Sequence, residues 1–399
     1  MAPDVYQDTL NFTAKLGQAL ARYGAPAHRI EDVLRLLTKD LGVNGVFSAT
    51  PSILLMEFRT ETSVDFRIER VHDNKIDLTR LRRLDRLFNE VAEQKVSPLE
   101  GLHQLDAIID APERFGPRLD VLAFALTSAS ATPMFGGSFS DIALGLITGA
   151  SVGLVAKLAP SRLLIPIGGF VAAFISTVLA PLFGAANIDA TTLAGIIVLV
   201  PGFTLTLAVS ELVTNNMTAG VSRLGAALVT ALSLSFGVVF GRAAGASIID
   251  INSIVTSTPA PLWASWLMLP VAVITINILF RAPVRQWGWI MLTSSLTFGS
   301  LQLAGLFMRP EFAVFVGGLT LGIASNVYAR LKDLPAAITR MPGLLFLVPG
   351  SLSFLSIRAV MLGQTEQATV TVGQLTLVAI SLVMGMVVAG TIIPPRKAL

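Results

Sequence analysis

The chain contains no cysteine, only three histidines and few charged side chains, which make up 14% of its 399 residues. Without cysteine it can form neither disulfides nor thiolate metal sites. His28, His72 and His103 are scattered without the spacing of metal ligands, so we expect no metal and no cofactor. Soluble domains carry roughly 25% charged residues. The deficit here, together with 53% hydrophobic residues, excludes an ordinary soluble protein.

Charge is concentrated in the first part of the chain. Residues 1–118 hold 16 of the 29 Lys and Arg, 18 of the 26 Asp and Glu and all three histidines, whereas residues 119–399 hold 13 basic and eight acidic residues. We therefore predict a soluble domain over residues 1–118 and a membrane-embedded remainder. The net charge of +3 reflects this asymmetry. A lipid bilayer is thus an expected partner and nucleic acid is not.

The soluble domain is predicted to be small, α+β and cytoplasmic. Helical periodicity covers residues 9–23, 28–41 and 77–92, and strand-like alternation covers 52–58 and 63–69. The first ten residues carry Asp4 and Asp8 and no apolar run follows a basic start, so no secretory signal is expected. The domain shows no catalytic constellation, and we do not expect an enzyme. A membrane-tethered enzyme or a sensor remains an alternative of a different class.

Ten charge-free windows, the second of them short, approach or exceed the length of about 18 residues that a spanning helix needs. They lie near residues 121–139, 142–157, 163–184, 190–211, 222–242, 262–280, 286–307, 312–330, 341–358 and 370–393. If the amino terminus is cytoplasmic, ten Lys and Arg fall in the inner loops and ends and three in the outer ones. This bias supports both the number of spans and an inner-membrane location with the soluble domain in the cytoplasm.

The tripeptide Val-Pro-Gly occurs twice within these windows, at residues 200–202 and, 148 residues later, at 348–350. Proline removes a backbone donor and glycine relaxes the chain, so carbonyl groups are freed at membrane depth. The breaks fall on the fourth and ninth windows, which are equivalent positions in two blocks of five. This pattern predicts two inverted five-helix repeats, over residues 119–243 and 262–399, with a substrate site between the two broken helices.

Polar residues beside the breaks are the candidate substrate ligands. Hydroxyl groups there suit a small polar or zwitterionic solute, whose carboxylate would favour the positive end of a half-helix. Each hydroxyl could instead bond a carbonyl of its own helix. Arg358 could pair with a substrate carboxylate or reach to the membrane interface. The predicted substrate site comprises Pro201, Gly202, Thr204, Ser210, Pro349, Gly350, Ser351, Ser353, Arg358, Ser138 and Asp141.

Two acidic residues lie within or at the edge of an apolar window, Asp141 and Glu211. Glu211 follows the first break by nine residues, about 13 Å further along a helix toward the cytoplasm. A partly desolvated carboxylate at that depth can exchange protons, so Glu211 is the predicted proton-coupling residue, with pairing to Arg223 as the alternative. Asp141 could equally well cap the start of a helix or contact the substrate, and Ser138 could form the helix cap in its place.

At these motifs the sequence resembles the threonine/serine exporter family. Four blocks carry the resemblance: Gly24–Arg29 followed by Asp32; Phe135-Gly-Gly-Ser-Phe-Ser-Asp141; Leu199-Val-Pro-Gly202 with Glu211 and Gly220-Val-Ser-Arg223; and Leu347-Val-Pro-Gly350. The likeness covers nearly the whole chain, and two halves that look like separate polypeptides in some members are fused here. The resemblance implies a cytoplasmic amino-terminal domain, about ten helices and export of small amino acids driven by the proton motive force.

The resemblance also leaves points open. Glu211 stands where Asp is expected in many relatives, and the aligned position in the second half is Ala359, so a proton role rests on one residue. Split relatives are associated with dicarboxylate export, which is the alternative function. The expected partners are a small amino acid, protons and lipid, and the sequence is compatible with a homo-oligomer.

Overall fold

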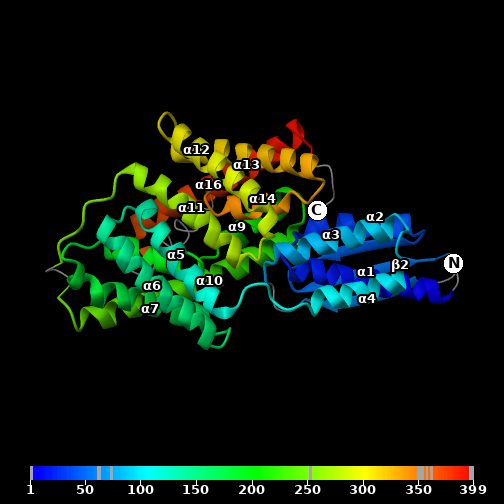
Figure 1. The fold of residues 1–399 in the computed structure, drawn as a ribbon, viewed down its shortest axis with the longest axis horizontal. Coiled ribbons are helices and arrows are strands. Elements are labelled where there is room, and N and C mark those ends of the chain that lie inside the picture. The colour runs from blue at the N-terminus through cyan, green and yellow to red at the C-terminus, as the bar shows by residue number, and fades with distance from the viewer. Residues whose placement is uncertain are drawn as a thin grey trace.

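The computed structural model describes residues 3–60, 64–71, 75–250, 254–347, 355, 358–359 and 363–394. Figure 1 shows two parts along the long axis: the first helices and strands, in blue, gather at one end, and the remaining helices, from cyan to red, form a bundle at the other. The protein is therefore a helical membrane protein with a small amino-terminal α+β region.

The amino-terminal region consists of four helices and a three-stranded sheet, and the helices cover one face of the sheet while the other face is exposed. Its elements are α1 (Pro3–Arg22), α2 (Ala27–Asp40), β1 (Asn44–Ala49), β2 (Ile53–Arg59), β3 (Val64–Arg70), α3 (Leu78–Ala92) and α4 (Pro98–Ile109). The strands are antiparallel in the order β1-β2-β3. Alternate residues of β2, among them Leu54, Met56 and Phe58, are buried against the helices. The predicted helices and strands are confirmed, whereas β1 and α4 were not predicted.

The membrane region consists of helices of unequal length. The first half holds α5 (Pro117–Ala131), α6 (Phe139–Leu158), α7 (Leu164–Leu179), α8 (Ile188–Ile196), α9 (Gly202–Val213) and α10 (Met217–Ala246). The second half holds α11 (Leu262–Leu279), α12 (Trp287–Gly305), α13 (Pro310–Lys332), α14 (Ala337–Leu344) and α16 (Thr365–Ile392). Short 3-10 turns, Pro133–Phe135, Ala180–Phe183 and Val284–Gln286, join some of them.

Six of the described helices are long and apolar enough to cross a membrane. They are Phe139–Leu158, Leu164–Phe183, Met217–Ala246, Leu262–Leu279, Pro310–Lys332 and Ala368–Ile392. The other four predicted windows coincide with the 15-residue α5, the broken pair α8 and α9, the more polar α12, and the short α14 with the residues that follow it. The protein thus has about six apolar spans, and the ten-helix count remains a prediction.

Two predicted boundaries are wrong for local reasons. The first window extends to residue 139, but α5 ends at Ala131 because Pro133 and Gly136, whose φ is 81°, turn the chain. The second window was expected to be short, yet α6 has 20 residues. Asp141 and Lys157 lie in its first and last turns, where charge complements the helix dipole, so a charge-free window underestimates the helix.

The first predicted break is confirmed. Residues 197–201 are not α-helical, and α9 restarts at Gly202 with Pro201 at its N-cap. Just before the second predicted break, α14 ends at Leu344, and backbone hydrogen bonds of the turn type continue to Leu347. Pro349, Gly350, Ser351 and Ser353 lie outside the described residues.

The two halves use corresponding residues for packing. Each half has its own apolar core cluster, and three members correspond at a spacing of 148 residues. They are Ile196, Leu199 and Leu234 in the first half and Leu344, Leu347 and Leu382 in the second. The helix pairs correspond too, because α7 packs on α10 as α13 packs on α16, and α6 packs on α7 and α8 as α12 packs on α13 and α14.

Small residues occupy the matching closest approaches. A Cβ built on Gly168 would lie 2.4 Å from a methyl carbon of Leu199, and a Cβ on Gly317 would lie 2.5 Å from a methyl carbon of Leu347. A side chain at either glycine would force the leucine to shift, and Leu199 and Leu347 each directly precede a Val-Pro-Gly segment in the sequence. The halves are therefore alike in side-chain packing as well as in order of helices.

Candidate functional site

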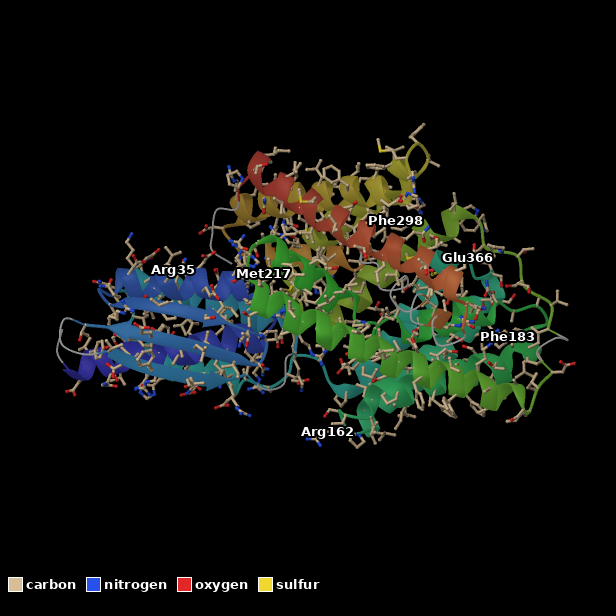
Figure 2. All side chains as sticks on the ribbon, turned by 180° about the vertical axis from the view of Figure 1, so that it is seen from behind. Arg35, Arg162, Phe183, Met217, Phe298 and Glu366 are labelled. Atoms are coloured by element: carbon tan, nitrogen blue, oxygen red, sulfur yellow. The ribbon has the colours of Figure 1, made fainter. Side chains whose placement is uncertain are left out.

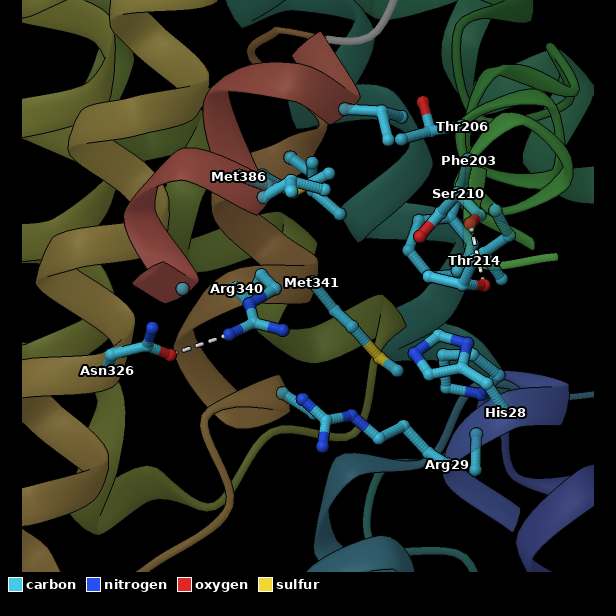
Figure 3. A pocket seen from close by; sticks show the side chains of 18 of the residues that line it. His28, Arg29, Phe203, Thr206, Ser210, Thr214, Asn326, Arg340, Met341 and Met386 are labelled. Atoms are coloured by element: carbon cyan, nitrogen blue, oxygen red, sulfur yellow. Dashed lines mark hydrogen bonds between the residues drawn. The ribbon is translucent and has the colours of Figure 1, made fainter. Parts of the chain in front are cut away.

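A cavity of about 220 Å³ lies between α9 and α14, on the side of the first break that faces the amino-terminal region (Figure 3). Helix α9 contributes Phe203, Thr206 and Ser210, and Thr214 caps its C-terminal end, while α14 contributes Arg340 and Met341. Asn326 of α13 and Met386 of α16 also line the membrane side of the cavity. The volume is below the roughly 300 to 1,000 Å³ of drug-sized sites, so it suits a small solute.

The amino-terminal region forms the remaining wall of this cavity. Ala25 and Pro26, which precede α2, and His28 and Arg29 of its first turn all line it. The region is held there by backbone bonds: the amide of Leu78 donates to the carbonyl of Phe280, 3.0 Å away, where α11 ends. The cavity is consequently a site between two parts of the protein and not a feature of the helix bundle alone.

Arg29 and Arg340 give the cavity an excess of positive charge. Arg340 donates from Nη2 to Oδ1 of Asn326 at 2.7 Å, and its buried Nε has no partner among the described residues. The Arg29 guanidinium forms no hydrogen bond or ion pair with another described residue, whereas its backbone amide donates to the carbonyl of Pro26 at 3.0 Å. Burial lowers the pKa of Arg29, an effect that nearby Asp32 opposes. Arginine nonetheless stays protonated in proteins, so both guanidinium groups carry their charge.

Glu211 lies behind this wall and is fully buried. Its two carboxylate oxygens each accept from Nε of Arg223 at 2.9 Å, and Oε1 also accepts from the backbone amide of Ala27 at 3.0 Å. Ala27 is the first residue of α2, and Pro26 before it has no capping side chain. Glu211 therefore caps a helix of the amino-terminal region from within the membrane region. The pairing with Arg223 is present, and proton coupling by Glu211 stays a prediction.

Other predicted site residues lie at the start of α6, which packs on the 3-10 turn Ala180–Phe183; Figure 2 shows Phe183 at the end of the bundle away from the amino-terminal region. Ser138 and Asp141 form a reciprocal capping box at the start of α6, so both are caps. The buried Asp141 carboxylate also accepts from the amide of Asn187 at 3.0 Å and from Oγ of Ser257 at 2.5 Å. Neither Ser138 nor Asp141 lines the cavity, and their substrate role remains a prediction without geometric support.

Arg358 is also away from the cavity. Its Nη1 donates to Oδ1 of Asp189 at 3.0 Å, and Asp189 pairs with Arg242 as well. These contacts join the second half of the chain to α8 and α10. The guanidinium of Arg358 thus bridges the two halves, and in this structure it is an ion-pair partner and not a cavity residue.

Of the site residues predicted around the first break, some line the cavity and others do not. Ser210 lines the cavity, whereas Pro201, Gly202 and Thr204 flank it without lining it. Thr206 lines it too, although its hydroxyl donates to the carbonyl of Gly202 at 3.1 Å, as the alternative for such hydroxyls predicts. The break therefore shapes the wall, and the side chains that face the cavity come from the helix after it.

Family models match both halves of the chain. The model described as "Putative threonine/serine exporter" matches residues 11–244, and the model described as "Threonine/Serine exporter, ThrE" matches residues 265–392. The chain belongs to the threonine/serine exporter family. The first match includes most of the amino-terminal region, so that region is part of the family's domain organisation.

Several curated relatives share this similarity. An uncharacterized protein of Schizosaccharomyces pombe is 28% identical over 363 residues, covering 86% of this chain and 47% of that protein. Pheromone-regulated membrane protein 10 of Saccharomyces cerevisiae is 23% identical over 355 residues, covering 86% and 46%. The protein of that name from Zygosaccharomyces rouxii is 23% identical, covering 86% and 36%. The chain spans less than half the length of these relatives. No solved structure matches the chain.

Among the polar residues that line the cavity, sequence reasoning missed five: His28, Arg29, Thr214, Asn326 and Arg340. Arg29 ends the first block that carries the family resemblance, but a location in a soluble domain directed attention away from the membrane site. The charge count places Arg340 in an inner loop. The sequence thus marked both arginines, Arg29 through the family resemblance and Arg340 through the charge count. It did not show that the amino-terminal region contacts the membrane region and so brings them together.

His28 faces the same cavity as a neutral side chain. Its buried Nδ1 has no partner among the described residues. Burial lowers the pKa of His28 to about 4, and the positive charges of Arg29, Arg340 and Arg223 add to the effect. The imidazole is therefore uncharged at neutral pH.

This shift predicts acid sensitivity. Because the folded state holds His28 at a pKa of about 4 and the unfolded state at 6.5, the unfolded state binds more protons between these values. Stability should thus fall as pH falls below 6.5, and His28 accounts for about 2 kcal/mol between pH 7 and pH 5. Melting of the purified protein at both pH values, with His28→Gln beside the parent, checks this. The His28→Gln variant should lose clearly less stability than the parent between pH 7 and pH 5. An equal loss in both proteins would show that His28 does not cause the acid sensitivity.

Proposed function

We propose that the protein is a secondary active transporter that exports small amino acids, threonine and serine, across the cytoplasmic membrane. The observation that carries the proposal is the small cavity between α9 and α14, the helices that border the two Val-Pro-Gly segments. Membership of the family supplies the substrate class. A transporter needs no catalytic group, and among the described residues no cluster of three or more metal-ligating side chains is found.

The membrane region is proposed to form ten helices as two inverted five-helix repeats, over residues 119–243 and 262–399. The corresponding cores and helix pairs support this arrangement. A further support is Thr127 on α5, which donates to Thr275 on α11 at 2.8 Å. These residues are 148 apart, so each contacts its own counterpart, as expected where a two-fold axis relates two repeats. The substrate site would then lie between repeats, where such transporters bind their substrates.

Alternating access is the proposed mechanism. The cavity lies toward the amino-terminal region, while Arg358 and Asp189 tie the two halves together at the far end. Opening outward requires that this far-end pair separates and that the inner wall closes. With the soluble domain in the cytoplasm, the present arrangement corresponds to an inner site closed to the outside. Protonation of Glu211, which would release both Arg223 and α2, is the proposed step that resets the cycle.

A dicarboxylate exporter is a second candidate, and one observation favours it. Among the described residues that line the cavity, Arg29 and Arg340 are cationic and none is acidic. A dicarboxylate would neutralise both charges, whereas an amino acid brings one carboxylate and an ammonium group for which the lining offers no counterion. The two candidates therefore differ in which charge the cavity must accommodate.

Efflux from proteoliposomes tests both candidates. Vesicles are loaded with labelled threonine, serine or succinate, and efflux is followed with and without an imposed pH gradient. Efflux of threonine or serine that depends on the gradient is the expected result. Efflux of succinate alone would favour a dicarboxylate exporter over an amino acid exporter. No efflux of threonine, serine or succinate would reject both candidate functions.

A further inference from the structure

We propose that Arg29 of the soluble domain and Arg340 of α14 together bind the carboxylate group of the transported solute, so that the soluble domain supplies part of the transport site. The inference rests on the proposed function and adds to it a binding residue from outside the membrane. It concerns a carboxylate, which an amino acid and a dicarboxylate share.

The two guanidinium groups reach the same cavity from different parts of the protein. Figure 3 shows Arg29 extending from α2 toward Arg340, with His28 beside it. Both residues line the cavity, and the buried carboxylate of Glu211 is already held by Arg223 and the amide of Ala27. Two cations that form no ion pair with a described residue are therefore turned into one small space.

Such an arrangement is costly unless an anion completes it. A buried charge without a partner destabilises a protein, and a guanidinium binds a carboxylate through two parallel hydrogen bonds. Arg340 uses Nη2 on a neutral acceptor, Asn326, and its Nε remains unpartnered among the described residues. The guanidinium donors of Arg29 bind no other residue that the structure describes, although the carboxylate of Asp32 lies near enough to raise the pKa of Arg29 against the effect of burial. A carboxylate placed between them would supply the missing acceptors.

The rest of the cavity fits the remainder of a small solute. Ser210 presents a hydroxyl, and Phe203, Met341 and Met386 give apolar contact surface. His28 is neutral, so it adds a polar group without further positive charge. The lining thus combines a strong carboxylate site at one side with a mixed, less charged surface at the other.

Binding and domain docking become linked in this arrangement. Because Arg29 belongs to the soluble domain and Arg340 to the membrane region, a carboxylate bound to both is a bridge between them. Glu211 holds the start of α2 and so acts as a positioning residue for Arg29, two residues further along the helix. Undocking of the soluble domain would remove half of the carboxylate contacts and release the solute.

The test is binding of labelled threonine, serine and succinate to the full-length protein in lipid nanodiscs. Arg29→Gln and Arg340→Gln should each weaken binding of the transported solute about ten- to hundredfold, the effect of losing hydrogen bonds to a charged group. Arg29→Lys, which keeps the charge but not the paired donors, should recover part of the affinity. Arg35→Gln is the matched control, because Arg35 is on the same helix with its side chain 61% exposed.

A second readout separates binding from folding. The methyl ester of the bound amino acid lacks the carboxylate charge, so the parent should bind it at least about tenfold more weakly than the acid, and Arg29→Gln should lose that discrimination. Unchanged affinity and unchanged discrimination in Arg29→Gln would overturn the inference, even if the variant melts at a lower temperature. If the parent binds and transports none of the three solutes, the proposed function fails instead.

Discussion

Gly237→Ala is expected to destabilise the membrane region by about 3 kcal/mol or more, the upper range for overpacking. Gly237 lies on α10, where a Cβ would be 2.1 Å from the backbone carbonyl oxygen of Pro166 on α7. A backbone atom cannot rotate aside as a side chain can, so α10 has to move away from α7. The two helices pack closely along their length, and the displacement would disturb that whole contact.

Gly385→Ala should have an effect of the same kind and size. A Cβ on Gly385, 148 residues after Gly237, would lie 2.4 Å from the carbonyl oxygen of Phe315 on α13. The chain offers matched controls on the same two helices, because Gly225 and Gly373 are also 148 residues apart and would have nothing within 4 Å of a new Cβ. Alanine at these control positions should be neutral or slightly stabilising, since it favours helix over glycine.

Yield of monodisperse protein and melting temperature in one detergent measure all four variants. The expected pattern is two damaged proteins and two that resemble the parent. A Gly385→Ala variant as stable as its Gly373→Ala control would contradict the correspondence between the halves. Damage in all four variants would show that glycine serves α10 and α16 for some reason other than close approach.

The features that could be predicted from the sequence are those that depend on neighbouring residues alone, such as helical periodicity, helix breaks and apolar windows. Periodicity located α1, α2 and α3, and the first Val-Pro-Gly placed a break where α8 ends and α9 begins. Charge-free windows found the apolar helices but misjudged their ends, because a charge in a terminal turn does not end a helix and Pro133 does. Local pattern therefore locates elements better than it locates their ends.

The cavity could be predicted only in part, because it depends on contacts between distant segments. Ser210 beside the first break was found, since a break in an apolar helix indicates a site. Arg29 was not, because nothing local in the amino-terminal region shows that its helix α2 starts against the membrane region. The apparent ligand Arg358 instead pairs with Asp189, 169 residues away, and no spacing rule connects those two.

The last strong expectation concerns Glu211→Gln, which should lower stability by about 3 to 5 kcal/mol, as for a buried ion pair that loses one partner. The change leaves the Arg223 side chain, only 13% exposed, without a carboxylate and weakens the cap on α2. Arg223→Gln should be similarly harmful, because it leaves Glu211 buried and uncompensated. The double variant should be clearly less harmful than the sum of the two single variants, since it removes both charges together.

Transport assays on the same variants separate pairing from proton coupling. If Glu211 carries the proton, Glu211→Gln should leave residual efflux that no longer responds to a pH gradient, whereas Arg223→Gln should keep the response at a lower rate. Glu366→Gln, which removes an exposed carboxylate at the start of α16, is the control and should change neither stability nor the response. Gradient dependence that persists in Glu211→Gln would leave Glu211 as one of the residues that join the amino-terminal region to the membrane region, and another residue would have to carry the proton.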